Sequence, residues 1–205
     1  VLFINFQNIA QDMAFRSNLS NLRSIGQSAK TMNEILRNVS LQVFFDDTLK
    51  NILYYPIGED PATPYSRRLY SYKNAFSLIE SIYIYNGTEF YVCPALGFTY
   101  KKETFQDDEI VAILDDMGIY HSNTIIPRYV DTTLIGEITN QAFIYSYLFY
   151  DSQLQSGKIE QAVVINISED FLHQSIAAYK EGSSNIQIID ENGITMKDDD
   201  TYPAL

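Results

Sequence analysis

Apolar residues recur at an alternating spacing of three and four along the first part of the chain, which is the heptad spacing of an α-helix. The members of this stripe are Leu22, Ile25, Ala29, Met32, Leu36, Val39 and Val43. The first 55 residues contain one glycine and no proline, so nothing there interrupts a helix strongly. The pattern therefore predicts one long helix that reaches Val43.

The same stripe becomes polar toward the N-terminus. Its earlier positions are Ile4, Asn8, Gln11, Phe15 and Asn18. Two interpretations stay open. Either the helix packs one face on its own domain, or its early turns also pair with a second copy of the chain in a homodimer, where polar seam residues set the register.

Shorter elements follow the long helix. In chain order, the pattern predicts a helix from Thr63-Pro64, strands over 82–85, 89–93 and 97–101, a helix over 107–117, strands over 141–150 and 159–167, a helix over 168–180 and a hairpin over 186–196. Asn86-Gly87 lies between the first two strands and is a strong hairpin signal. The strands cluster between helices without a βαβ alternation, which indicates an α+β fold with a mostly antiparallel sheet.

This order of elements predicts three parts. We expect residues 1–45 to form a stalk helix, 46–182 the main module, and 183–205 the start of a second, truncated unit, because its hairpin has no closing element after it. No apolar run approaches the roughly 18–20 residues that cross a bilayer. The apolar start Val1-Leu2-Phe3-Ile4 resembles the tail of a longer apolar segment, so we expect the chain to be a fragment of a longer protein.

The charge of the chain excludes one class of partner. It carries 14 Lys and Arg against 26 Asp and Glu, a net charge of −12. Residues 1–79 hold 8 basic and 6 acidic side chains, whereas residues 80–205 hold 6 and 20, a net charge of −14. So acidic a surface repels phosphate backbones, and nucleic-acid binding is not expected.

Catalytic and metal-binding signals are weak. The chain has two histidines and one cysteine, Cys93, and no His or Cys pair has the spacing of metal ligands. The motifs of serine hydrolases and of phosphate-binding loops do not occur. We therefore expect no enzymatic activity, no metal and no cofactor.

Two polar residues have apolar neighbours. Arg128 ends the run Ile125-Ile126-Pro127, and Asn166 shares a strand face with Ala162 and Val164. A buried guanidinium or amide must be paired, either within the protein or by a ligand. For both residues a structural pairing and a ligand contact remain open at this stage.

Several segments together resemble a known family. They are the long helix through Val43, Ser81–Asn86, Ile126-Pro127-Arg128, Phe143–Tyr150, Gln161–Ile167 and Ile188–Gly193. Along nearly its whole length the chain resembles the extracellular Cache-type sensor region of bacterial membrane receptors. It is most similar to those of Gram-positive sensor histidine kinases and membrane-bound AraC-type regulators.

The resemblance implies a helix that leaves a membrane span, a PAS-like membrane-distal module over 46–182 that holds a small ligand against its sheet, and a membrane-proximal module that begins at 183. The best-defined subgroup binds amino acids through an Arg followed by Trp-Tyr and a later Asp on a strand. This chain departs twice, because Tyr129-Val130 follows Arg128 and Asn166 stands where the Asp would fall. The resemblance therefore does not extend to amino acids as the ligand.

The charge pattern places the ligand near Arg128. It is the only basic residue between Lys102 and Lys158, and a guanidinium binds a carboxylate in bidentate fashion. Aromatic residues on one face of strand 141–150 are expected to form a pocket wall, and further tyrosines and an amide to add hydrogen bonds. The expected ligand-binding residues are Arg128, Tyr129, Tyr145, Tyr147, Asn166 and Tyr83, and the expected ligand is a small carboxylate or a sugar.

These observations predict a non-catalytic, ligand-sensing ectodomain on the extracellular side of the cell membrane, in a receptor whose output is a histidine kinase or an AraC-type regulator. The receptor would be membrane-anchored and a dimer through its N-terminal helix. The alternative is a solute-binding protein that delivers a ligand to a transporter. A third interpretation is an adhesion module without a small ligand.

Overall fold

The structure is a computed structural model that describes residues 2–56, 63–93, 98–116, 120–130, 142–151 and 158–168, and the short segments 188–189 and 195–196. The chain divides into two compact units. One comprises Ile35–Phe171 and is called the sheet unit below, and the other comprises Val1–Glu34 with Leu172–Leu205. The division falls within the first helix.

The sheet unit contains a six-stranded antiparallel sheet in the order β3-β2-β1-β6-β5-β4. Its strands are β1 (Ile79–Tyr85), β2 (Glu89–Cys93), β3 (Phe98–Lys101), β4 (Thr124–Val130), β5 (Ala142–Tyr150) and β6 (Ala162–Ser168). The first and last strands of this sheet in sequence, β1 and β6, pair at its centre, so each of them has a paired strand on both edges. β4 lies at one edge and contains Pro127, as is typical of an edge strand, where a missing N–H is tolerated.

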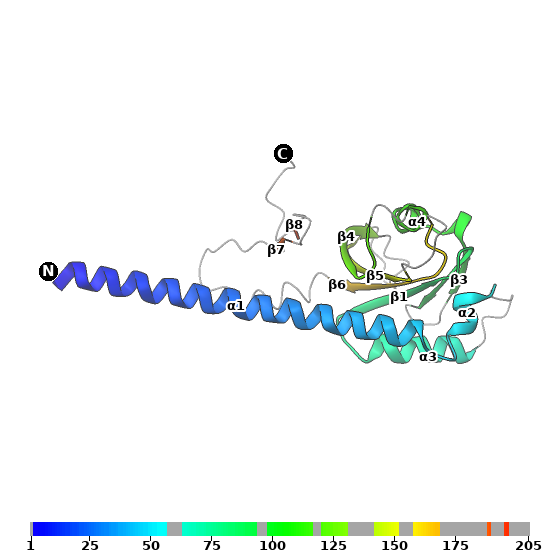
Figure 1. Cartoon of the computed structure of the whole chain (residues 1–205), viewed down its shortest axis with the longest axis horizontal. Coiled ribbons are helices and arrows are strands. Elements are labelled where there is room, and N and C mark those ends of the chain that lie inside the picture. Colours follow the sequence, from blue (N-terminus) through cyan, green and yellow to red (C-terminus); the bar gives the residue numbers. More distant parts are fainter. Residues whose placement is uncertain are drawn as a thin grey trace. The chain divides into compact units, whose positions relative to one another are not determined.

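One face of the sheet is covered by helices from the first part of the chain (Figure 1). They are the last turns of α1 (Leu2–Phe44), together with α2 (Lys50–Tyr54) and α3 (Thr63–Asn74). Leu36, Val39 and Val43 of the predicted stripe are buried, and the Phe44 ring meets the Phe149 ring of β5 edge-on at 5.1 Å. The last turns of α1 are therefore part of the core of the sheet unit.

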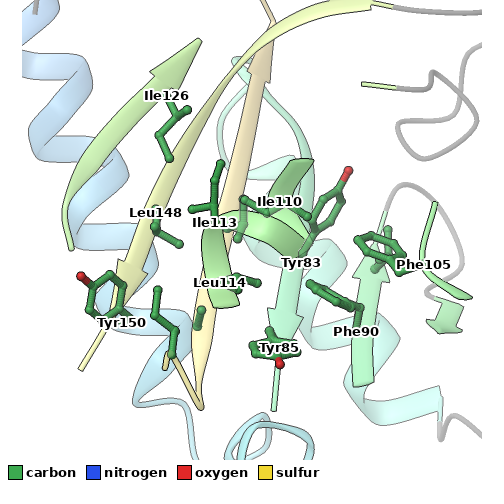
Figure 2. Packing of buried hydrophobic residues seen from close by; sticks show 14 of the residues in the cluster. Tyr83, Tyr85, Phe90, Phe105, Ile110, Ile113, Leu114, Ile126, Leu148 and Tyr150 are labelled. Atoms are coloured by element: carbon green, nitrogen blue, oxygen red, sulfur yellow. The ribbon is translucent and has the colours of Figure 1, made fainter. Parts of the chain in front are cut away.

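The opposite face is covered by α4 (Asp108–Asp115). Ile110, Ile113 and Leu114 of α4 pack with Tyr83 and Tyr85 of β1 in one hydrophobic cluster (Figure 2). A short 3-10 helix (Lys102–Thr104) precedes α4 in the chain. The Phe105 ring, also in the cluster, stacks on that of Phe90 with the ring centroids 4.1 Å apart. Since both faces are covered, the strands of the sheet are apolar on both sides.

The predicted α+β class, long N-terminal helix and antiparallel sheet with flanking helices are confirmed. The predicted hairpin also forms, and Gly87 has φ +92° with a Cβ position only 3.2 Å from the Glu160 carbonyl oxygen, so a side chain there is disfavoured. The pair β7 (Ile188–Ile189) and β8 (Thr195–Met196) matches the last predicted hairpin. Ser168, the predicted start of the helix over 168–180, is the last residue of β6, and the rest of that predicted helix lies outside the described residues.

The helix α1 has 43 residues, about 65 Å at a rise of 1.5 Å per residue. Phe15 and Leu22 lie in its early turns, on the heptad stripe that is called the heptad seam below, and are 66% and 57% exposed. Within the described residues, no helix is both long and apolar enough to cross a membrane.

Asp46 connects the end of α1 to α3. One of its carboxylate oxygens accepts hydrogen bonds from the backbone N–H groups of Thr48 and Leu49 at 2.9 and 3.2 Å. The other accepts from Arg68 Nε at 2.6 Å and from the Tyr72 hydroxyl at 2.9 Å. Burial acts to raise the pKa of Asp46, but these hydrogen bonds outweigh burial and hold the pKa below its ordinary value.

We expect Asp46→Asn to lower the free energy of unfolding by about 1–2 kcal/mol at neutral pH, because hydrogen bonds to a charged acceptor are lost. A carboxyl whose pKa is lowered by folding contributes stability above its unfolded pKa, and this contribution disappears as the pH falls through the folded value. The difference between wild type and variant should therefore shrink from neutral pH to below about pH 4 in urea unfolding. The control is Asp47→Asn, an exposed carboxylate paired with Lys50, and an equal effect there would contradict the assignment.

Candidate functional site

A group of polar side chains is buried on the α4 face of the sheet, inside the hydrophobic cluster. Its members are Ser81 of β1, Arg128 of β4, Ser146 of β5, Asn166 of β6 and Asp107, which precedes α4; all are buried. We call these five residues the polar cluster. A polar group in an apolar core is stable only if its hydrogen bonds are made inside the protein or by a ligand.

Strand register brings these residues together. Asn166 lies directly opposite Ser146 on β5 and directly opposite Ser81 on β1. Side chains alternate between the faces of a sheet, so all three point to the same face. Arg128 is paired with Ile144, one position of the same face away from Ser146, and its long side chain covers that distance.

The hydrogen bonds of the polar cluster form a chain of donors and acceptors that begins at Arg128 and ends at Ser81. Arg128 Nε donates to Ser146 Oγ at 2.6 Å, and Ser146 Oγ donates to Asn166 Oδ1 at 2.6 Å. Arg128 Nη2 donates to the same oxygen at 3.3 Å, and Asn166 Nδ2 donates to Ser81 Oγ at 2.8 Å. The two serines thus contact an amide rather than a base, which is not the arrangement of a catalytic nucleophile.

Asp107 connects the polar cluster to α4. Its Oδ1 accepts the Ile110 N–H at 3.2 Å as the N-cap of α4, and it also accepts a hydrogen bond from Arg128 Nη1. The side chains of Arg128 and Asp107 are 0% and 2% exposed. The guanidinium is therefore neutralised by a buried carboxylate, which is the structural pairing that the sequence left open for Arg128.

Two buried oxygen atoms beside this ion pair make no hydrogen bond within the described residues. They are Asp107 Oδ2 and the Tyr83 hydroxyl. Burial raises the pKa of Tyr83, the Asp107 carboxylate raises it further, and Arg128 and Ser81 act in the opposite direction. Asp107 and Arg128 thus both act on the Tyr83 hydroxyl. An unsatisfied buried polar atom is unfavourable, so these two oxygens mark the place where an additional polar group would be stabilised.

The structure brings together only some of the expected ligand-binding residues. Arg128, Asn166 and Tyr83 lie on the α4 face, but Tyr145 and Tyr147 lie on the opposite face, because they alternate with Ser146 along β5. The expected single pocket formed by all of them is therefore corrected. The error came from combining the aromatic face of β5 with Arg128, which lies on the other side of the sheet.

The opposite face accounts for the tyrosines by itself. The Tyr147 hydroxyl donates to Asn123 Oδ1 at 2.9 Å, and burial raises the pKa of Tyr147 to about 12. Tyr129 is 57% exposed, and its ring contacts that of Phe143 edge-on at 5.1 Å. Phe143 in turn contacts the Tyr145 ring at 5.3 Å. These rings form a continuous row on that face.

Asp107, Ser81 and Ser146 were missed as members of the site. The sequence predicts Asp107 only as the first residue of the helix over 107–117. Ser146 carried a signal, since it is a polar residue among the inward-facing apolar residues of its strand. Among the described residues, no group of three or more His, Cys, Asp or Glu is arranged to hold a metal ion.

Comparison with known proteins relates the chain to solved structures by fold alone. No family model and no curated protein matches its sequence. Among solved structures, the extracellular domain of a protein assigned as a histidine kinase, vpHK1S-Z8, matches with a TM-score of 0.53 and 11% identity, over 91% of this chain and 69% of that chain. This likeness shows a shared fold, with a long N-terminal helix followed by an antiparallel sheet and helices.

Weaker matches include the ligand-binding domain of the Campylobacter jejuni chemoreceptor Tlp3 in complex with L-norvaline. Its TM-score is 0.45 at 14% identity, over 85% of this chain and 63% of that chain. The sensory domain of the same chemoreceptor with isoleucine bound has a TM-score of 0.39 at 15% identity, over 85% and 72%. The chain thus spans less than two thirds of the norvaline-bound domain.

We expect Arg128→Met to lower the free energy of unfolding by about 3–5 kcal/mol, because Asp107 is left as an unpaired buried charge. Adding Asp107→Asn should recover part of this loss, since the double variant buries no charge. Urea unfolding of the two single variants and the double variant gives the coupling energy. Additive effects, or a loss below about 1 kcal/mol for Arg128→Met, would contradict a buried ion pair.

Proposed function

We propose that this chain is the extracellular ligand-sensing part of a bacterial membrane receptor. The observation that carries the proposal is the single helix α1, whose last turns form part of the core of the sheet unit, in a fold shared with the extracellular domain of vpHK1S-Z8. A long helix that enters the core is a direct mechanical connection between a sensing module and a membrane anchor. The part itself is non-catalytic, and the receptor output is a histidine kinase or an AraC-type regulator of a Gram-positive bacterium.

The ligand in this proposal is a small polar solute that binds on the α4 face, beside the polar cluster. Two observations support this place. Polar side chains from four strands and the start of α4 converge there, and the Tyr83 hydroxyl and Asp107 Oδ2 have no hydrogen-bond partner among the described residues. Small-molecule sites are mostly apolar with a few convergent polar groups, and the surrounding cluster of α4 and β1 is apolar.

Signal transfer in this proposal crosses the sheet through β5. Ser146 belongs to the polar cluster on one face of the sheet. Phe149, three positions further along the same strand, contacts Phe44 of α1 on the other face. Interiors are close-packed, so a displacement of β5 is transmitted to what packs on it. Asp46 then fixes the end of α1 to α3, so that α1 moves with the sheet unit.

The ligand is tested by thermal unfolding of the chain with a panel of small polar solutes at fixed ionic strength. A bound solute stabilises the folded state by RT ln(1 + [L]/Kd), so members of one solute class should raise Tm. Tyr83→Phe removes a hydroxyl that makes no hydrogen bond to the described part of the chain. It should leave the unliganded Tm nearly unchanged and weaken solute binding by about 3- to 10-fold, the size of one hydrogen bond.

Tyr147→Phe is the matched control, because its hydroxyl lies on the other face and bonds to Asn123. It should lower stability by about 1 kcal/mol and leave the solute response unchanged. A panel in which no solute raises Tm argues against ligand sensing, and equal responses of the two variants argue against the α4 face.

The receptor in this proposal is a parallel dimer through α1. Asn18 lies between Phe15 and Leu22 on the heptad seam, and both apolar neighbours are exposed. A cysteine at Asn18 in the membrane-anchored full-length protein should therefore crosslink faster than one at Ser17, which is off the seam. The native Cys93 is buried and its pKa is raised to about 11, so it stays protonated and does not compete. Equal crosslinking at the two positions would exclude this seam.

A further inference from the structure

The charge of the α4-face site differs from what the sequence predicts. Arg128 was expected to attract an anion, but its guanidinium already contacts the Asp107 carboxylate in a fully buried ion pair. The remaining bonds of Arg128 go to Ser146 and Asn166. A carboxylate from solution would have to displace Asp107, which also caps α4 through Ile110.

The polar atoms left for a ligand are both oxygens. Asp107 Oδ2 is a carboxylate oxygen and accepts hydrogen bonds only, whereas the Tyr83 hydroxyl both donates and accepts. A ligand hydroxyl satisfies both by donating to Asp107 and accepting from Tyr83, and an ammonium group satisfies both by donating. A carboxylate would bring a charged acceptor against a charged acceptor, which is unfavourable in a buried site.

The surroundings have the same sign. Burial raises the pKa of Glu109, on the first turn of α4, while Arg128 lowers it and Asp107 raises it, so Glu109 lies within the electrostatic reach of the ion pair. Asp108 is next to it on the same exposed turn. These carboxylates add negative charge close to the ion pair, which disfavours an anion there.

We propose that Asp107 sets the charge selectivity of this site: it closes Arg128 to carboxylates and presents its free oxygen, with the Tyr83 hydroxyl, to a hydrogen-bond donor of the ligand. This inference rests on the proposed function for the existence of a natural ligand. It narrows the ligand from a carboxylate or sugar to a solute that presents a hydroxyl or an ammonium group. Asn166 supports this selectivity, since it is a neutral amide and leaves Asp107 as the carboxylate that balances Arg128 in the polar cluster.

The test is a reversal of selectivity. Asp107→Asn keeps the size of the side chain and an oxygen that caps α4, but it leaves the Arg128 charge unbalanced. Binding of sodium acetate, methylammonium chloride and glucose is measured at constant ionic strength by Tm shifts and by the Ile110 amide signal in NMR spectra. Asp107→Asn should bind acetate at least about tenfold more tightly than wild type, a difference of 1.4 kcal/mol.

Asp108→Asn is the matched control, because it removes the same charge from the exposed neighbouring position. It should bind acetate as weakly as wild type. The double variant Asp107→Asn with Arg128→Gln should lose the gain. If Asp107→Asn folds only in the presence of acetate, that rescue is itself the expected gain, provided that equimolar chloride does not produce it.

The proposal is overturned if wild type prefers acetate to both donor probes in an Arg128-dependent way, if folded Asp107→Asn gains no affinity for acetate, or if Asp108→Asn gains as much. Preference of wild type for glucose or for methylammonium supports the proposal and tells a hydroxyl ligand from an ammonium ligand. Failure of this selectivity proposal can be distinguished from failure of the sensor proposal. A gain in acetate binding by Asp107→Asn stands even if no natural solute is found, and Tyr83-dependent solute binding stands even if the selectivity does not reverse.

Discussion

The ion pair between Arg128 and Asp107 is the contact on which the α4 side of the structure depends. A buried guanidinium is costly unless a carboxylate and further acceptors surround it, and here one carboxylate pairs the guanidinium and begins α4 at the same time. The position of a whole helix over the sheet is thereby tied to one residue of β4. Because Ser146 Oγ and Asn166 Oδ1 accept the other hydrogen bonds of Arg128, three strands and α4 are held in a single arrangement.

The alternation of side chains along the strands separates this arrangement from the helical face. In β5, Ser146 points to α4, while Tyr147 points toward the face where α1 packs and Phe149 contacts Phe44 there. Consecutive residues of the single strand β5 thus belong to opposite faces of the sheet, and this strand connects the two faces. That short connection gives the proposed sensor a physical basis, since neither face can change its packing without moving the same backbone.

Much of the fold follows from local sequence. The heptad stripe through Val43, the Asn86-Gly87 turn and the acidic start at Asp107 each predict an element from interactions within a few residues, and each element forms. The face of Asn166 also follows, because it depends only on a period of two. The partner of Arg128 does not, since Asp107 is one of many acidic residues and its choice depends on how α4 lies over the sheet. The sequence also did not place Tyr145 and Tyr147 on the face opposite to Arg128, because a strand pattern separates two faces but does not say which of them an adjacent strand shares.

Pro127 has a consequence for how copies of this module behave at high local concentration. It lies in β4, one of the two edge strands of the described sheet, in register with Tyr145 of β5. Exposed edge strands are templates on which another chain can add a strand, and natural sheets oppose this with proline and charge at the edge. A proline in the middle of β4 removes one of the donors that a docking strand needs. Strand addition by a second copy is therefore opposed at the β4 edge of the sheet.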